Sequence, residues 1–177
     1  MRKRLTKRLR RASRLDAQSA NVTRFIRTAK KFCALIETSG SHERPAFFKE
    51  CFRLVTKLLS EIVDLPDVGK LRSGRQVTND ESHEIRQRLQ QKIGESDNYK
   101  MVFDPWKTED AIYGSISDDL AGIWRDLRNG LLVLKKDDAS NAICEWRFSF
   151  FFHWGPHHAS QLLRPLFSLA FKEELEP

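Results

Sequence analysis

Three polar residues share one narrow face of a predicted helix that is otherwise rich in aromatic residues. Glu145, Ser149 and His153 follow one another at four-residue intervals, which keeps side chains on one side of a helix. The rest of segment 146–154 is mostly Trp and Phe, a composition that predicts a central, buried helix. Because a carboxylate or an imidazole is costly to bury without a partner, this strip should meet polar groups of another helix. It could form a structural network, a ligand or metal pocket, or a catalytic pocket.

Two more histidines follow this strip. His153 and His157 have the i, i+4 spacing with which two imidazoles can bind one metal ion. Pro156 lies between them and removes a helical hydrogen bond, so Gly155-Pro156 is predicted to end one helix and begin another. His157 and His158 would then lie in a new first turn, where the helix dipole disfavours a charged imidazole.

Two aspartates border the apolar stripe of the preceding predicted helix, residues 115–135. Asp119 and Asp126 share one face about two turns apart. Asp118 points away from the stripe and suits the first turn of the helix, with Ser115 as its N-cap. Asp119 and Asp126 are either boundary carboxylates that bond neighbouring arginine or backbone groups, or members of a polar or metal site.

The short connection around residues 137–141 predicts that these two helices pack antiparallel. With a rise of about 1.5 Å per residue, Asp126 lies level with His153, and Asp119 lies level with the region just beyond His157. We therefore expect two carboxylate–imidazole pairs, Asp126 with His153 and Asp119 with His157. Two such pairs opening to one cavity could hold a divalent metal or a small ligand, with Glu145 outside the site.

Arg147 and His153 form an R-x5-H spacing, which resembles the Arg…His motif of the helical HEPN-type ribonucleases. Phe148 follows Arg147 at a position where that motif would have a polar residue. The resemblance implies RNA cleavage, and we keep it as one enzymatic alternative beside metal-dependent hydrolysis.

Three longer strings resemble a bacterial, all-helical family of domains of unknown function. The resemblance covers about residues 22–170 and implies a helical fold without implying an activity. Pro156 and Pro165 depart from the family pattern, and the first 14 residues lie outside it. The strings are Tyr99-x-x-x-Phe103-Asp104-Pro105, Ser115-x-x-Asp118-Asp119-Leu120-x-x-Ile123-x-Arg125-Asp126-Leu127 and Glu145-Trp146-Arg147-Phe148-x-Phe150-x-x-His153-Trp154-Gly155-x-His157.

Hydrophobic periodicity predicts an all-α bundle of five or six helices, with the aromatic-rich helix at its centre. Leu occurs 20 times and Val only 7 times, which also favours helix over sheet. The helices are expected at about 21–38, 45–62, 78–93, 115–135 and 138–175, the last with breaks at Gly155-Pro156 and Pro165. Residues 66–77 are predicted to be a flexible connection.

Segment 95–114 is too aromatic for a polar linker. It contains Tyr99, Phe103, Trp106 and Tyr113, so we expect it to lie pinned across the body, with a turn at Asp104-Pro105.

Positive charge is concentrated at the start of the chain. Of 31 Lys and Arg against 24 Asp and Glu in 177 residues, eight bases and no acid lie within residues 1–14. We expect a disordered basic arm over residues 1–18, followed by a single all-α domain over residues 19–177. The arm could contact an anionic surface or nucleic acid, or could resemble a transit peptide. The remainder lacks the basic excess typical of nucleic-acid binding.

The chain has no apolar run near the ~20 residues that span a bilayer. Its three cysteines, Cys33, Cys51 and Cys144, match no zinc or redox spacing, and their odd number without a signal peptide indicates a reducing cytoplasm.

The leading hypothesis is a cytoplasmic binding or regulatory module with a semi-buried pocket of Asp119, Asp126, His153 and His157, which could hold a metal or a small ligand. The alternatives are an enzyme, and a purely structural or protein-interaction domain. Convergence of the Asp and His residues around an open cleft would favour the first two hypotheses, and a sealed or dispersed arrangement would favour the third.

We predict that residues 1–14 are dispensable for folding, because they hold the excess charge and add no stripe to the core. Deleting them should leave the melting temperature nearly unchanged and lower the isoelectric point towards neutrality. Differential scanning calorimetry of both chains checks this, and a clear loss of thermal stability would show that the arm is packed.

Overall fold

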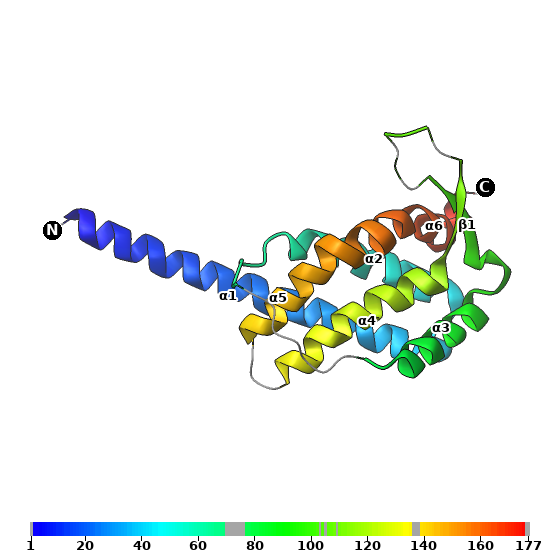
Figure 1. Cartoon of the computed structure of the whole chain (residues 1–177), viewed down its shortest axis with the longest axis horizontal. Coiled ribbons are helices and arrows are strands. Elements are labelled where there is room, and N and C mark those ends of the chain that lie inside the picture. Colours follow the sequence, from blue (N-terminus) through cyan, green and yellow to red (C-terminus); the bar gives the residue numbers. More distant parts are fainter. Residues whose placement is uncertain are drawn as a thin grey trace.

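The computed structural model of the chain describes residues 2–69, 77–102, 104, 106–108, 110–135 and 139–175, with the side chains of 2–18 and 173 left out. Helices dominate this part of the chain, so the predicted all-α class is confirmed (Figure 1). The elements are α1 (Arg2–Glu37), η1 (Ser39–Ser41), α2 (Arg44–Ile62), α3 (Asn79–Ile93), η2 (Gly94–Asp97), β1 (Asn98–Met101), β2 (Ile112–Ser115), α4 (Ile116–Leu134), α5 (Ala139–Ser149), η3 (Phe150–Ala159), α6 (Ser160–Ala170) and α7 (Lys172–Leu175).

The centre of the bundle is α4. It packs against α1, α3, α5 and η3, and most of its residues are buried. Ser115 caps its N-terminus as predicted, by accepting a hydrogen bond from the amide of Asp118. The expectation that the aromatic-rich helix is central is therefore wrong.

The aromatic-rich segment instead lies on the outside of α4, so only one of its sides can be buried. Trp146 and Trp154 point into the core, whereas Phe148, Phe151 and Phe152 are 51%, 54% and 68% exposed. The exposed rings pack on one another, and Phe148 and Phe152 have ring centroids 4.9 Å apart.

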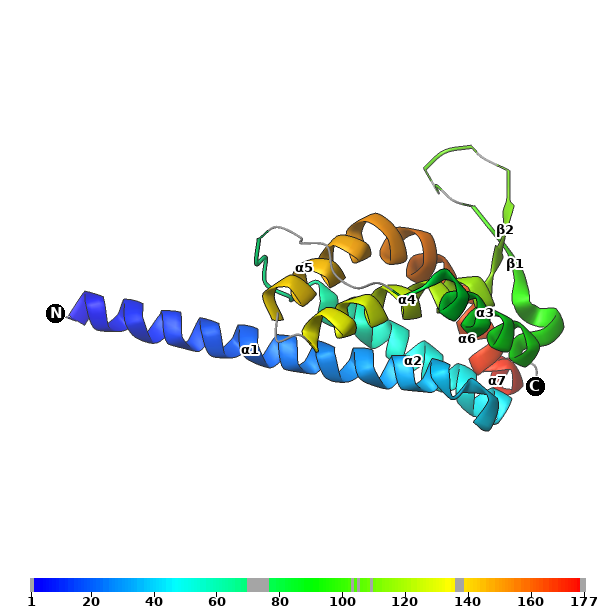
Figure 2. The same cartoon turned by 60° about the horizontal axis from the view of Figure 1, so that its bottom comes forward.

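The helix α1 packs against α4, and α2 packs against α1 and α6. Phe25, Phe32, Cys51 and Leu58 are among their buried residues. The first turns of α1 carry the basic arm and project well past the body (Figures 1 and 2). The side chains of the arm lie outside the described residues, and the boundary near residue 18 stays a prediction.

The segment between α3 and α4 is a β-hairpin that projects from the body, so the expectation that it is pinned across the body is wrong (Figure 2). Trp106 and Tyr113 are 94% and 72% exposed, whereas Tyr99 turns inward to pack against the core. Tyr99 lies opposite Gly114, where a Cβ would overlap its ring. Phe103 and Pro105, and with Pro105 the predicted turn, lie outside the described residues.

The chain from residue 139 to 170 is helical without interruption, because α5, η3 and α6 follow one another directly. The predicted break at Gly155-Pro156 is replaced by a π-helix, η3, in which backbone hydrogen bonds link residues five apart. The wider turn accommodates Pro156, whose ring would clash with the preceding turn of an α-helix. A Cβ at Gly155 would overlap the carbonyl oxygen of Phe150, so only glycine fits there.

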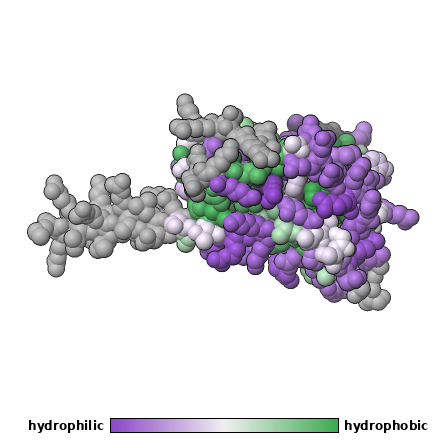
Figure 3. All heavy atoms as spheres, turned by 90° about the horizontal axis from the view of Figure 1, so that it is seen from below, coloured by the Kyte–Doolittle hydropathy of each residue, from purple (hydrophilic) through white to green (hydrophobic). Residues whose placement is uncertain are grey.

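The face of the molecule shown in Figure 3 is mostly hydrophilic, and hydrophobic residues gather near the end from which α1 projects. None of the helices in the described ranges combines the length and the apolar character that a membrane crossing requires.

We predict that Trp146 contributes strongly to the stability of the core. Its ring packs edge-on against Phe25, its Nε1 donates to the carbonyl of Leu127 at 3.0 Å, and it occupies the space that a side chain at Gly130 would need. Trp146→Ala should reduce the free energy of unfolding by roughly 3–5 kcal/mol in urea titrations. The control is Phe148→Ala on the exposed side of α5, which should cost much less. Equal costs would contradict this assignment.

Candidate functional site

The predicted pair between Asp126 and His153 is confirmed. Nδ1 of His153 lies 2.7 Å from Oδ2 of Asp126, across the contact between η3 and α4. On its other side, Nε2 of His153 lies 3.2 Å from Nη2 of Arg125. Because a guanidinium group only donates hydrogen bonds, Nε2 must accept and the ring proton must sit on Nδ1. In this tautomer His153 donates to Asp126 through Nδ1.

Asp119 forms the second pair, but its partner is His158 and the predicted pair with His157 is wrong. Nδ1 of His158 lies 2.9 Å from Oδ1 of Asp119. The hydroxyl group of Tyr99 donates to Oδ2 of the same carboxylate at 2.6 Å. Tyr99, Asp119 and His158 thus form a hydrogen-bonded chain that joins β1, α4 and η3.

The π-helix is the physical reason for this one-residue error. The prediction assumed α-helical spacing, in which residues four apart share a face, whereas in a π-helix residues five apart are stacked. His153 and His158 therefore face α4 together, and their ring centroids are 4.8 Å apart. His157 is exposed instead. Pro156 was the available signal, because it disfavours an ordinary α-helix at this point.

Glycine on α4 lets the second pair approach closely. A Cβ at Gly122 would overlap the ring of His158, so the imidazole lies directly on the helix backbone. Gly130 of the same helix likewise allows the ring of Trp146 to lie against the backbone, because a Cβ there would overlap that ring. The two contacts together hold α5 and η3 close to α4.

Burial governs the charges behind the two imidazoles. It is the largest cause of the raised pKa of Asp119, and the hydrogen bonds from His158 and Tyr99 oppose it. Burial also raises the pKa of Tyr99, and its bond to Asp119 acts in the same direction. The pKa of Glu145 is raised by burial and then by the nearby charge of Asp126.

A polar pocket of about 340 Å³ opens in front of both imidazoles, between α3, α4 and η3. Its wall includes His153, His158 and Arg125 on one side and His83 and Arg86 of α3 on the other. The carboxylate of Asp118, on α4, also lines the pocket and forms an ion pair with Arg86 at 3.3 Å. Glu145 is not part of the wall, in agreement with the prediction. His158 was not predicted because of the π-helix, and Arg125, His83 and Arg86 were not predicted because only the packing of η3 and α3 on α4 brings them to this pocket.

A metal centre is not assembled here. Among the residues that the structure describes, no three or more His, Cys, Asp or Glu side chains are arranged to hold a metal ion. Asp126 is bonded to Nδ1 of His153 and Asp119 to Nδ1 of His158, and His157 takes part in neither pair.

The arginine of the R-x5-H spacing is used elsewhere. Nη1 of Arg147 donates to the carbonyl of Leu65 at 2.7 Å, and the guanidinium lies 5.5 Å from the centroid of the Phe151 ring. His153 is paired with Asp126 and Arg125 instead. The arrangement expected for a HEPN-like ribonuclease is therefore not formed by Arg147 and His153.

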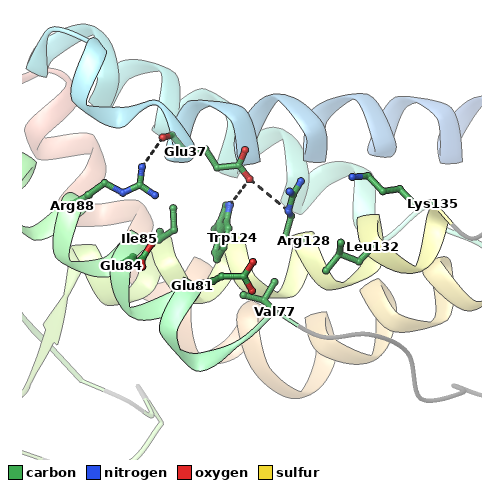
Figure 4. A pocket seen from close by; sticks show the side chains of 10 residues that line it. All are labelled: Glu37, Val77, Glu81, Glu84, Ile85, Arg88, Trp124, Arg128, Leu132 and Lys135. Carbon is green, nitrogen blue, oxygen red and sulfur yellow. Dashed lines mark hydrogen bonds and ion pairs between the residues drawn. The ribbon is translucent and has the colours of Figure 1, made fainter.

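A second pocket, of about 380 Å³, lies between α1, α3 and α4, and Glu37 bonds to three other residues of its wall (Figure 4). The carboxylate of Glu37 accepts from Trp124 at 3.1 Å and lies 3.7 Å from Nε of Arg128. The backbone carbonyl of Glu37 accepts from Arg88. These contacts fasten the end of α1 to α3 and α4, so this pocket serves the packing of the helices.

The comparisons with known proteins agree on the fold. A family model described as Domain of unknown function (DUF5063) matches residues 16–172, which confirms the resemblance found in the sequence. The crystal structure of protein BF1032 from Bacteroides fragilis is similar, with a TM-score of 0.70 and 23% identity, over 85% of this chain and 95% of that chain. Among curated proteins, none matches the chain.

The pair of Asp126 and His153 predicts energetic coupling. In a double-mutant cycle with Asp126→Asn and His153→Gln, the two losses of unfolding free energy should be non-additive by about 0.5–3 kcal/mol. The reason is that either change alone weakens the hydrogen bond between the two side chains, so the second change has less to remove. A control cycle combines Asp126→Asn with His42→Gln, since His42 bonds to Thr38 instead, and should be additive. Additivity in the first cycle would contradict the pairing.

Proposed function

The chain belongs to the family described as Domain of unknown function (DUF5063), and we propose that it is a binding module whose pocket between α3, α4 and η3 receives a small anionic ligand. One observation carries this proposal. Two imidazoles, each anchored through Nδ1 by a buried carboxylate, line a polar pocket together with two arginines. Such anchoring fixes the orientation and tautomer of a ring before a ligand arrives.

The arrangement of charge favours an anion. Asp119 and Asp126 lie behind the imidazoles and are almost fully buried, so a ligand meets the rings before it meets the carboxylates. Asp118 is the acidic side chain of the described pocket wall, and it is paired with Arg86. Arg125 stands beside His153 with more than a third of its side chain exposed. A guanidinium fork matches the oxygens of a phosphate or a carboxylate.

The imidazoles can adapt to such a ligand. If an anion takes the hydrogen bond that Arg125 gives to His153, Nε2 of the ring faces the ligand while Nδ1 stays bonded to Asp126. The pocket volume is at the lower end of the range for small-molecule sites, which supports a compact ligand such as a phosphate monoester.

Acid–base catalysis at the same pocket is a second candidate. An imidazole oriented through Nδ1 by a carboxylate is the usual form of a general base, and the chain of Tyr99, Asp119 and His158 has this form. In His153 the corresponding nitrogen is bonded to Arg125, so this ring would act only after Arg125 moves.

A cytoplasmic location belongs to the same proposal. All three cysteines are free, and Cys33 and Cys51 are buried in the core, which suits a reducing compartment.

Inorganic phosphate is the probe for the pocket. Isothermal titration calorimetry should detect phosphate binding to the full chain, and Arg125→Gln should weaken it at least about tenfold, or 1.4 kcal/mol. The reason is the loss of the guanidinium next to His153. The matched control is Arg53→Gln on the surface of α2, which should bind phosphate like the unaltered chain. Thermal melts of both variants establish that they are folded.

Two results would overturn this proposal. One is the same affinity in the Arg125→Gln and Arg53→Gln variants. The other is the absence of a phosphate signal beyond that of sodium chloride at equal ionic strength.

A further inference from the structure

The hairpin presents a strand edge. Its sheet has only β1 and β2, in the register that pairs Asn98 with Ser115 and Met101 with Ile112. Within the described ranges, no strand pairs with the other edge of β1. An unpaired edge presents backbone N–H and C=O groups to any extended chain that can reach it.

A groove of about 600 Å³ runs along this edge, between β1 and α6. All residues from Asn98 to Val102 line it in succession. Because successive side chains of a strand point to opposite faces, a lining of consecutive residues indicates that the groove follows the strand edge. The opposite wall is one face of α6, formed by residues at helical spacing that include Gln161, Arg164 and Ser168.

The hairpin also concentrates exposed apolar side chains. Val102, Trp106, Ile112 and Tyr113 are all at least 40% exposed. Clustered exposure of this kind marks an interaction surface more often than an inert one. A two-stranded hairpin is only marginally stable by itself, so a third strand would add to its stability.

We propose that the groove between β1 and α6 binds an extended acidic peptide segment of a partner protein, which pairs with the free edge of β1 as a third strand. Lys100 and Arg164 contribute to the described lining, and no acidic side chain does, so the charge of the groove complements acidic side chains. Ile116 and Leu169 supply apolar contact for one face of the peptide.

In this mode of recognition, the backbone provides affinity and the side chains provide specificity. The strand edge supplies hydrogen bonds that are independent of sequence, and the wall of α6 selects the side chains. The site is distinct from the anion pocket, which lies between α3, α4 and η3. Its test therefore does not depend on phosphate binding.

Selection from a phage-displayed library of random linear peptides tests the proposal, with the full chain as bait. Peptides rich in Asp and Glu should be enriched, and fluorescence anisotropy then measures the affinity of the best one. N-methylation of its alternate backbone amides should weaken binding at least about tenfold for one of the two alternate sets, because only one set faces β1. Arg164→Glu should weaken binding to a similar degree, while the matched surface change Arg53→Glu should not.

Three results would overturn the proposal. The first is a selection in which the unaltered chain enriches no peptide over the Arg164→Glu bait. The second is a selected peptide whose affinity survives N-methylation of either alternate set. The third is light scattering that shows the free chain to be a dimer that the change Met101→Lys dissociates, which would make a second copy of the chain the occupant.

Discussion

Two buried carboxylates on the central helix constrain the rest of the structure. Asp119 and Asp126 lie on α4 in the interior, where an unpaired charge would cost several kcal/mol. Each is therefore bonded to an imidazole from the neighbouring helix. Gly122 allows the approach that the second of these bonds requires. The need to pair these carboxylates therefore fixes both the height and the rotation of η3 on α4.

This constraint explains why the helix changes its type. His153 and His158 must face the same neighbour, and an α-helix would turn residues five apart to different sides. A π-helical segment brings them into line, and Gly155 and Pro156 are the residues that make such a segment acceptable. Phe151 and Phe152 of this segment lie at the surface, beside Phe148 at the end of α5.

Several of these features follow from local patterns in the sequence. The helices α1 to α4, the cap at Ser115, and the level of His153 opposite Asp126 depend only on regular helical geometry. The partner of Asp119 was misassigned by one residue because that geometry changes at Pro156. The course of residues 95–114 was misjudged because aromatic side chains were assumed to be buried, whereas Trp106 belongs to a projecting hairpin. The walls of the pocket depend on α3, whose weak apolar stripe did not indicate which residues would face α4.

Tyr99 contributes to two sites. It lines the groove beside α6, and its hydroxyl group donates a hydrogen bond to Asp119, the carboxylate that orients His158. Thermodynamic reciprocity applies to such an arrangement: if an occupant of the groove displaces the phenol and thereby changes the affinity of the proposed anion pocket for its ligand, that ligand changes the affinity of the groove by the same factor. Tyr99 thus joins the two proposed binding sites through one chain of hydrogen bonds.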